Sequence, residues 1–262
     1  MQENERGFAD KRELENKAPG IVKVLGAVFF DSGLLGIFWF IGMILATAIW
    51  TLWQYFSHAG QIPNSKPDQF ALMLISIPAL YLSILAVWAI RGQQLHLPEI
   101  ARPKKQMLLF AIGTGLALCV FTMLSTYVVN TAGLRLQPSN QTLLEDTGKQ
   151  WPIIISIFAI VIAPIFEELF FRKQIFARCV RAGYVITAYL LSSLLFALMH
   201  EPMPTQGMLR WLLMLGLYGS IGAVLAWVYR KTGRLWLAMV AHASNNLFAM
   251  SMLLISSSMS SV

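Results

Sequence analysis

Long stretches without any charged residue decide what this chain can fold into. Seven such runs occupy residues 32–65, 69–90, 106–134, 150–166, 182–200, 211–229 and 235–262. Most of them contain the roughly 20 apolar residues that a helix needs to cross a bilayer. Only 13% of the 262 residues are charged, whereas soluble domains carry about 25%. A soluble enzyme is therefore excluded.

We predict an all-α protein, a polytopic membrane helical bundle of about seven transmembrane helices. The helices are expected at about 33–55, 70–90, 107–130, 152–182, 184–200, 208–229 and 235–255. Only part of the fourth helix is expected to lie in lipid. An eighth element is expected if residues 21–30 lie in the membrane interface rather than in water.

The 20 Lys and Arg residues are unevenly distributed over the segments between these helices. Counted over alternate segments, 16 fall on the side that includes the N-terminus and four on the other. Because basic loops stay in the cytoplasm, we expect a cytoplasmic N-terminus and an external C-terminus. The net charge of +7 marks loops rather than one patch with interleaved aromatic residues, so nucleic-acid binding is not expected.

Ionisable residues interrupt three of the C-terminal helices, where a charge near the bilayer centre costs at least about 2.5–3.5 kcal/mol. The first group contains Glu167, Glu168 and Arg172. Glu168 and Arg172 are four residues apart on one helical face and can pair. Glu167 is rotated by about 100° from Glu168 and stays available for other work. The alternative is a helix end whose charged residues are simply solvated.

The second group is His200, at the end of an apolar run, followed by Glu201. The His-Glu-x-x-His zinc motif needs a second histidine at position 204, which is proline, so that interpretation fails. The alternative for His200 is an interfacial histidine at a helix end. The segment 201–207, with two prolines, would begin at membrane depth, where irregular backbone needs protein or water around it. We therefore expect a water-filled cavity there.

The third group contains His242 and Asn246, which share one face of the last helix. The alternative is interhelical hydrogen bonding as packing. If the chain turns at Gly183, Glu167 and His200 both lie about 25 Å from that turn and face each other. His242 lies only about 13 Å beyond Gly233. The three share a level if the first hairpin projects about 11 Å further into the cytoplasm.

The motifs Glu-Glu-x-x-x-Arg at 167–172, Phe-x-x-x-His at 196–200 and His-x-x-x-Asn at 242–246 occur in this order. Together they resemble the CPBP family of intramembrane proteases, which includes CAAX prenyl endopeptidases of the Rce1 type and bacterial proteins tied to bacteriocin processing and self-immunity. The resemblance covers about residues 150–250. From the distribution of charged and apolar residues we expect a mobile cytoplasmic tail at 1–20, N-terminal membrane helices at 21–150 and a tail at 256–262. The resemblance implies a catalytic membrane core at 151–255.

The resemblance also implies roles for the motif residues. Glu167 and His200 would activate the hydrolytic water, and His242 and Asn246 would support the oxyanion. Peptide hydrolysis needs such a base, a proton donor for the leaving amine and donors for the developing oxyanion. We therefore expect an endopeptidase of the cell membrane that acts on membrane-associated or lipidated peptides or on membrane proteins.

Glu168 and Arg172 are the remaining motif positions. Two histidines with one or two glutamates could also ligate zinc and leave an open position. We favour a mechanism without a cofactor, because the ligands would come from three helices without a paired-histidine motif. Zinc stays open as the alternative.

Two other classes of function compete with the hydrolase. A non-catalytic membrane protein, such as an immunity factor, would act by binding a peptide or partner. A transporter would use the same carboxylates and histidines to relay protons, but the chain lacks paired broken helices in two related halves. Small residues at four-residue spacings in 208–229 indicate close helix packing, either within the monomer or in a dimer, so the oligomeric state stays open.

Overall fold

The computed structural model describes residues 19–57, 104–134, 136 and 152–259, together with the isolated positions 79, 82, 83 and 86. Within these residues every regular element is a helix and no strand occurs. The predicted all-α fold is confirmed. Most of the helix expected at 70–90, the N-terminal 18 residues and the last three residues lie outside the described residues.

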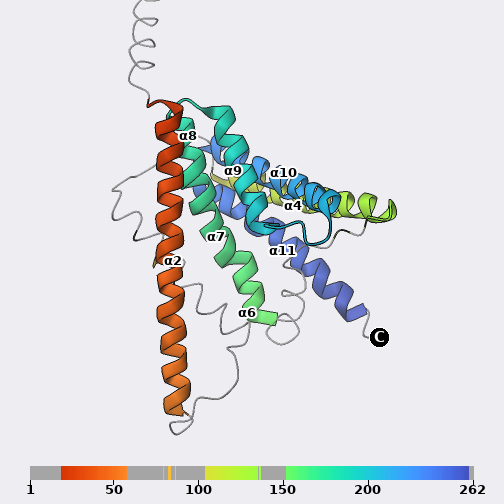
Figure 1. Cartoon of the computed structure of the whole chain (residues 1–262). Coiled ribbons are helices and arrows are strands. Elements are labelled where there is room, and N and C mark those ends of the chain that lie inside the picture. Colours follow the sequence, from red (N-terminus) through yellow and green to blue (C-terminus); the bar gives the residue numbers. More distant parts are fainter. Residues whose placement is uncertain are drawn as a thin grey trace, which may run out of the picture.

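The first described helix, α2 (Ile21–Ser57), is one continuous element of 37 residues. It begins 12 residues before the expected start at 33, so residues 21–30 are part of this helix and not a separate interfacial element. The reason is Asp31, which is 1% exposed. Asp31 accepts a hydrogen bond from Gln174 at 2.7 Å and pairs with Arg178, so its charge does not end the helix. Figure 1 shows α8 beside the N-terminal part of α2.

The span from Pro152 to Arg181 is a chain of α- and π-helical segments rather than a uniform α-helix. Its parts are α6 (Pro152–Ile157), η1 (Phe158–Ile162), α7 (Ala163–Glu167), η2 (Glu168–Phe176) and α8 (Ala177–Arg181). π-Helical turns are rare and occur mostly at functional sites. Here they flank Glu167 on both sides, so the backbone is irregular where the first motif lies.

Three further helices complete the C-terminal half: α9 (Val185–His200), α10 (Met208–Thr232) and α11 (Leu235–Met259). The expected turn at Gly183 is present with φ +89°, and Gly233 at φ +68° ends α10. The positive φ angles suit glycine, which has no Cβ to clash. Helix α4 (Lys104–Thr131) packs along α11.

One of the small residues of α10, Gly222, packs closely against α9. A Cβ on Gly222 would meet the Cα of Ser193 at 3.1 Å and the Phe196 side chain at 3.4 Å. A Cβ on Gly216, by contrast, would meet nothing within 4 Å. The close helix packing expected from the sequence is therefore an α9–α10 contact at Gly222.

Four of the described helices are long and apolar enough to cross a membrane: α2, α4, the Pro152–Arg181 span and α10. Helix α9 is apolar but has only 16 residues, and α11 carries His242, Asn245 and Asn246 in its middle, which lowers its mean hydropathy. The chain is thus a multi-pass membrane protein, as predicted. The main buried apolar cluster includes Phe171, Phe176 and Phe196, next to the motif residues.

Candidate active site

Three helices bring Glu167, His200 and His242 to one buried point. Glu167 is the last residue of α7, His200 is the last residue of α9, and His242 lies in the first half of α11. The Glu167 Oε2 atom lies 3.9 Å from His200 Nε2 and 3.7 Å from His242 Nε2. This oxygen is buried and makes no hydrogen bond. The carboxylate therefore faces both imidazoles without being committed to either.

Glu168 and Arg172 form a fully buried pair behind these residues. Arg172 Nε lies 3.0 Å from Glu168 Oε2, and both side chains are 0% exposed. Arg172 also donates a hydrogen bond to the Gly222 carbonyl at 3.1 Å and lies 4.8 Å from the centre of the Phe196 ring. The guanidinium thus compensates the buried carboxylate and ties it to α9 and α10.

The adjacent glutamates reach the same ring from different directions. Glu168 Oε1 lies 3.0 Å from His242 Nδ1, while Glu167 faces Nε2 of the same imidazole. The two ring nitrogens point away from each other, so side chains that diverge along the helix both reach His242. Glu167 and Glu168 thus point in different directions from the helix, as expected, and both still contact His242.

The hydrogen bonds at Nδ1 fix how both rings face the cavity. His200 Nδ1 lies 2.9 Å from the Phe196 carbonyl, which accepts only, so Nδ1 carries the hydrogen. The same reasoning places a hydrogen on His242 Nδ1, which faces the Glu168 carboxylate. In the neutral rings, both Nε2 atoms then turn a lone pair toward Glu167. Three acceptors around one point suit a donor such as water.

The Glu167 oxygen and the two Nε2 atoms are also the atoms that would coordinate a metal ion. The distances between them therefore test whether a metal would fit. Tetrahedral zinc, with ligand bonds of about 2.0–2.2 Å, holds its donors about 3.4 Å apart. The separations of 3.7 and 3.9 Å are wider. Among the described residues, no group of three or more His, Cys, Asp or Glu side chains is arranged to hold a metal ion. In this arrangement these residues do not fit a metal.

Asn246 lies in the same cavity but makes its contacts elsewhere. Its amide donates to the carbonyl of Ala159 in η1 at 2.8 Å, and its oxygen accepts from Asn245 at 3.0 Å. The structure thus joins Glu167, Glu168, Arg172, His200 and His242 in one contact network. It places Asn246 on the wall of that site, holding α11 against η1.

The cavity measures about 410 Å³ and lies between α4, η1, α7, α9, α10 and α11. Tyr218 and Asn245 are among the lining residues that were not predicted from the sequence. Tyr218 of α10 stacks on His200, with ring centres 4.4 Å apart and an interplanar angle of 22°. Asn245 lies beside Asn246. Nothing distinguishes Tyr218 from the other aromatic residues of its helix, whereas Asn245 stands out only as a second amide in an apolar run.

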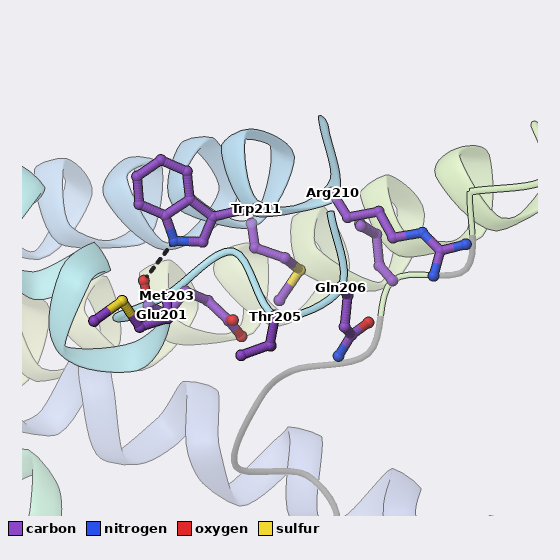
Figure 2. A pocket seen from close by; sticks show the side chains of 8 residues that line it. Glu201, Met203, Thr205, Gln206, Arg210 and Trp211 are labelled. Carbon is purple, nitrogen blue, oxygen red and sulfur yellow. Dashed lines mark hydrogen bonds between the residues drawn. The ribbon is translucent and has the colours of Figure 1, made fainter. Parts of the chain in front are cut away.

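A second, small pocket lies where the irregular segment 201–207 was expected to enclose water. Glu201 is buried, and its carbonyl accepts a hydrogen bond from Trp211 Nε1 at 2.9 Å, as Figure 2 shows. The pocket measures about 10 Å³, which is about the space that one water molecule needs. Because Glu201 follows His200 directly, this bond fixes the end of α9 that carries the histidine.

Comparison with known proteins supports the resemblance of the motifs. Residues 149–248 match the model of the type II CAAX prenyl endopeptidase Rce1-like family. The chain is 32% identical over 120 residues to the putative membrane peptidase YdiL of Bacillus subtilis, covering 46% of this chain and 45% of YdiL. It is 31% identical to the UPF0177 protein YxdF of Lactococcus lactis, covering 49% of this chain and 69% of YxdF.

A third relative is the membrane-embedded CAAX protease MroQ of Staphylococcus aureus. It is 29% identical over 159 residues, which are 57% of this chain and 60% of MroQ. The matches thus span 45% of YdiL, 60% of MroQ and 69% of YxdF. No solved structure matches the chain.

The fold and the comparisons define a multi-pass membrane protein that is similar to membrane peptidases and has a cavity lined by acid and imidazole side chains. The chain belongs to the CPBP family of Rce1-like CAAX proteases.

Proposed function

We propose that this protein is an intramembrane endopeptidase that hydrolyses peptide bonds in membrane-associated or lipidated peptides or in membrane proteins. One observation carries the proposal. The uncommitted carboxylate of Glu167 faces two imidazole nitrogens inside a cavity of about 410 Å³ between membrane helices. Acyl transfer to water needs a base of this kind next to a water-binding site.

In the proposed reaction, a water molecule binds between Glu167 and the Nε2 atoms of His200 and His242. Glu167 removes a proton while the water oxygen attacks the scissile carbonyl carbon. The proton then passes through His200, whose Nε2 atom lies 3.9 Å from Glu167 Oε2, to the leaving amine, and the C–N bond breaks. The second amide hydrogen of Asn246 is proposed as one donor to the oxyanion, and His242 is proposed as another after its Nε2 atom has taken up a proton.

Glu168 and Arg172 are proposed to hold His242 rather than to contact substrate. The hydrogen bond that His242 Nδ1 donates to Glu168 sets the ring orientation, and Arg172 pairs with Glu168 and holds it in place. A carboxylate that orients a catalytic imidazole has this role in serine proteases, where replacing it costs about 10⁴ in kcat.

The first test compares the membrane proteomes of wild-type and Glu167→Ala cells. We expect peptide termini that appear in wild-type membranes and are lost in the variant. Glu201→Gln is the matched control. Glu201 is a buried carboxylate that directly follows His200, but it lines the separate small pocket. Identical termini in wild type and Glu167→Ala would support a binding or immunity role that needs no hydrolysis.

The second test concerns the metal. Purified protein is treated exhaustively with a chelator and analysed for bound zinc. We expect proteolytic activity to survive without stoichiometric zinc. Activity that is lost and then restored by zinc would replace the proposed glutamate mechanism by a metalloprotease mechanism, in which the donor atoms must first move closer together.

A further inference from the structure

Most hydrogen-bond donors that line the cavity are already committed to partners. Thr122 donates to the Leu118 carbonyl at 2.9 Å, and the Asn245 amide donates to Asn246 at 3.0 Å. Asn246 uses one of its two amide hydrogens on Ala159. The neutral rings of His200 and His242 carry their hydrogens on Nδ1, away from Glu167. A developing oxyanion would therefore find few neutral donors in this cavity.

Tyr218 is a further donor among the described residues that line the cavity. Its ring is held flat against His200 at 4.4 Å. Its hydroxyl makes no hydrogen bond to any described residue, and it lies close enough to Glu167 and Glu201 to interact electrostatically with both. A phenol with a typical pKa near 10 carries its proton at neutral pH, so this hydroxyl is a donor.

We propose that the Tyr218 hydroxyl donates a hydrogen bond to the oxyanion of the tetrahedral intermediate, which makes Tyr218 a catalytic residue outside the three motifs. This inference rests on the proposed function. The step transfers no proton: the water oxygen forms its bond to the carbonyl carbon, the carbonyl oxygen takes the negative charge, and the phenol O–H points to it. Tyr218 keeps its proton when the C–N bond breaks.

The stack on His200 explains how such a donor is positioned. Donors aimed at an oxyanion act because they are oriented before the reaction, and removing one typically costs about 10²–10³ in kcat. A tyrosine that packs against the histidine of the water site moves with that site. Its hydroxyl can therefore stay within reach of the substrate carbonyl that the same histidine faces.

The test uses wild type and variants reconstituted in liposomes, with detergent-extracted membrane protein from Glu167→Ala cells as substrate, because uncleaved substrates accumulate there. Initial rates of formation of new peptide termini are measured over a dilution series of the extract. For Tyr218→Phe, which keeps the ring and its stack, we expect the limiting rate to fall about 10²–10³-fold. The half-saturating extract concentration should stay unchanged.

Tyr127→Phe is the matched control, because Tyr127 lies 67% exposed on α4, outside the cavity. It should cleave like wild type. Thermal unfolding of each variant shows whether it is folded. If Tyr218→Phe unfolds at a lower temperature than wild type, Tyr218→Trp is the second variant, because it keeps an aromatic ring and places its N–H elsewhere. A limiting rate of Tyr218→Trp equal to wild type would count against the proposal.

A limiting rate of Tyr218→Phe equal to wild type, with Glu167→Gln inactive, would overturn the role of Tyr218 and leave the peptidase intact. An unchanged limiting rate with a higher half-saturating concentration would also overturn it, since the hydroxyl would then bind substrate in the ground state. If wild type and Glu167→Gln both form no new termini, the proposed function itself fails.

Discussion

Among the individual side chains, the two adjacent glutamates have clearly different surroundings. Glu168 is fully buried between Arg172 and His242, with both of its oxygens in contact with these groups. Glu167 borders the cavity, and its Oε2 atom makes no hydrogen bond. One carboxylate is therefore fixed in place and the other is available to a water molecule, although they are neighbours in sequence.

Replacing Glu168 by Gln tests this division. The change leaves Arg172 as a buried cation without its partner, so we expect a loss of about 3–5 kcal/mol in the free energy of unfolding. Activity should also fall, because His242 loses the carboxylate that orients it. The double variant Glu168→Gln, Arg172→Met should recover most of the stability by removing both charges. Thermal unfolding and the rate of peptide-terminus formation give the two readouts.

The double variant should not recover activity. If it cleaves substrate at the wild-type rate, Glu168 does not orient His242 for catalysis, and the pair is only structural.

The motif residues could be predicted because polar groups are rare in apolar helices. Glu167, His200 and His242 each interrupt a run that otherwise suits lipid, and their cost in a membrane indicates a function. Tyr218 could not be predicted, because its contact with His200 depends on how α9 and α10 pack. The hydrogen bond from Asn246 to Ala159 could not be predicted for the same reason, because the two residues are 87 positions apart in the chain.

Among the helices, the contact between α4 and α11 depends on one glycine. A Cβ on Gly115 would lie 2.3 Å from the Ala241 carbonyl oxygen and 2.9 Å from the Asn245 backbone nitrogen. Such distances do not occur, so α11 would have to move. Since α11 carries His242, the position of the imidazole depends on the absence of a side chain at Gly115.

We therefore expect Gly115→Ala to lower both the unfolding temperature and the rate of cleavage. Gly113→Ala is a close control on the same helix, because a Cβ there meets nothing within 4 Å. Alanine at that position should keep activity, and by helix propensity alone it stabilises by up to about 1 kcal/mol. Equal cleavage rates for the two variants would mean that α11 tolerates the displacement.

Helix α2 is attached to the C-terminal helices through a buried acid. Asp31 pairs with Arg178 and Gln174, while Val28 beside it is 0% exposed in the main apolar cluster. Asp31→Asn removes the charge and keeps the shape, so we expect a loss of about 3 kcal/mol in the free energy of unfolding. Lys23→Gln removes an exposed charge from the same helix and should change stability by less than about 0.5 kcal/mol. Unfolding temperatures that agree for both variants would contradict a structural role for Asp31.

The helices themselves were predicted better than the details of their ends. Expected and observed bounds differ by at most three residues at either end for α4, α9 and the Pro152–Arg181 span. The start of α2 was wrong because a charged Asp31 suggested a boundary, whereas its partners come from residues more than 140 positions later. The π-helical turns around Glu167 could not be predicted from hydropathy, because they change the backbone hydrogen bonding and not the composition.

For the chain as a whole, the basic residues and the site lie at different depths. Arg178, Arg230 and Arg234 lie near the turns at Gly183 and Gly233, on the side predicted to be cytoplasmic. Glu167 and His200 lie further along their helices, away from those turns. If the predicted orientation holds, the loop 202–207 lies toward the external side, and its residues are exposed.

Cysteine labelling of intact cells tests this orientation. Both native cysteines are buried, Cys119 at 4% and Cys179 at 0% exposure, and they are replaced by Ala in the background protein. Thr205→Cys lies in the exposed external loop, so we expect a membrane-impermeant thiol reagent to modify it in intact cells. Val22→Cys, at a position 81% exposed near the start of α2, should react only after the cells are made permeable.

The reverse pattern would place the N-terminus outside, and the 16 basic residues that follow the positive-inside rule here would then lie on the wrong side of the membrane. Protection of Thr205→Cys in both states would mean instead that the loop is buried in lipid or protein, which its irregular backbone allows only where its polar groups find partners.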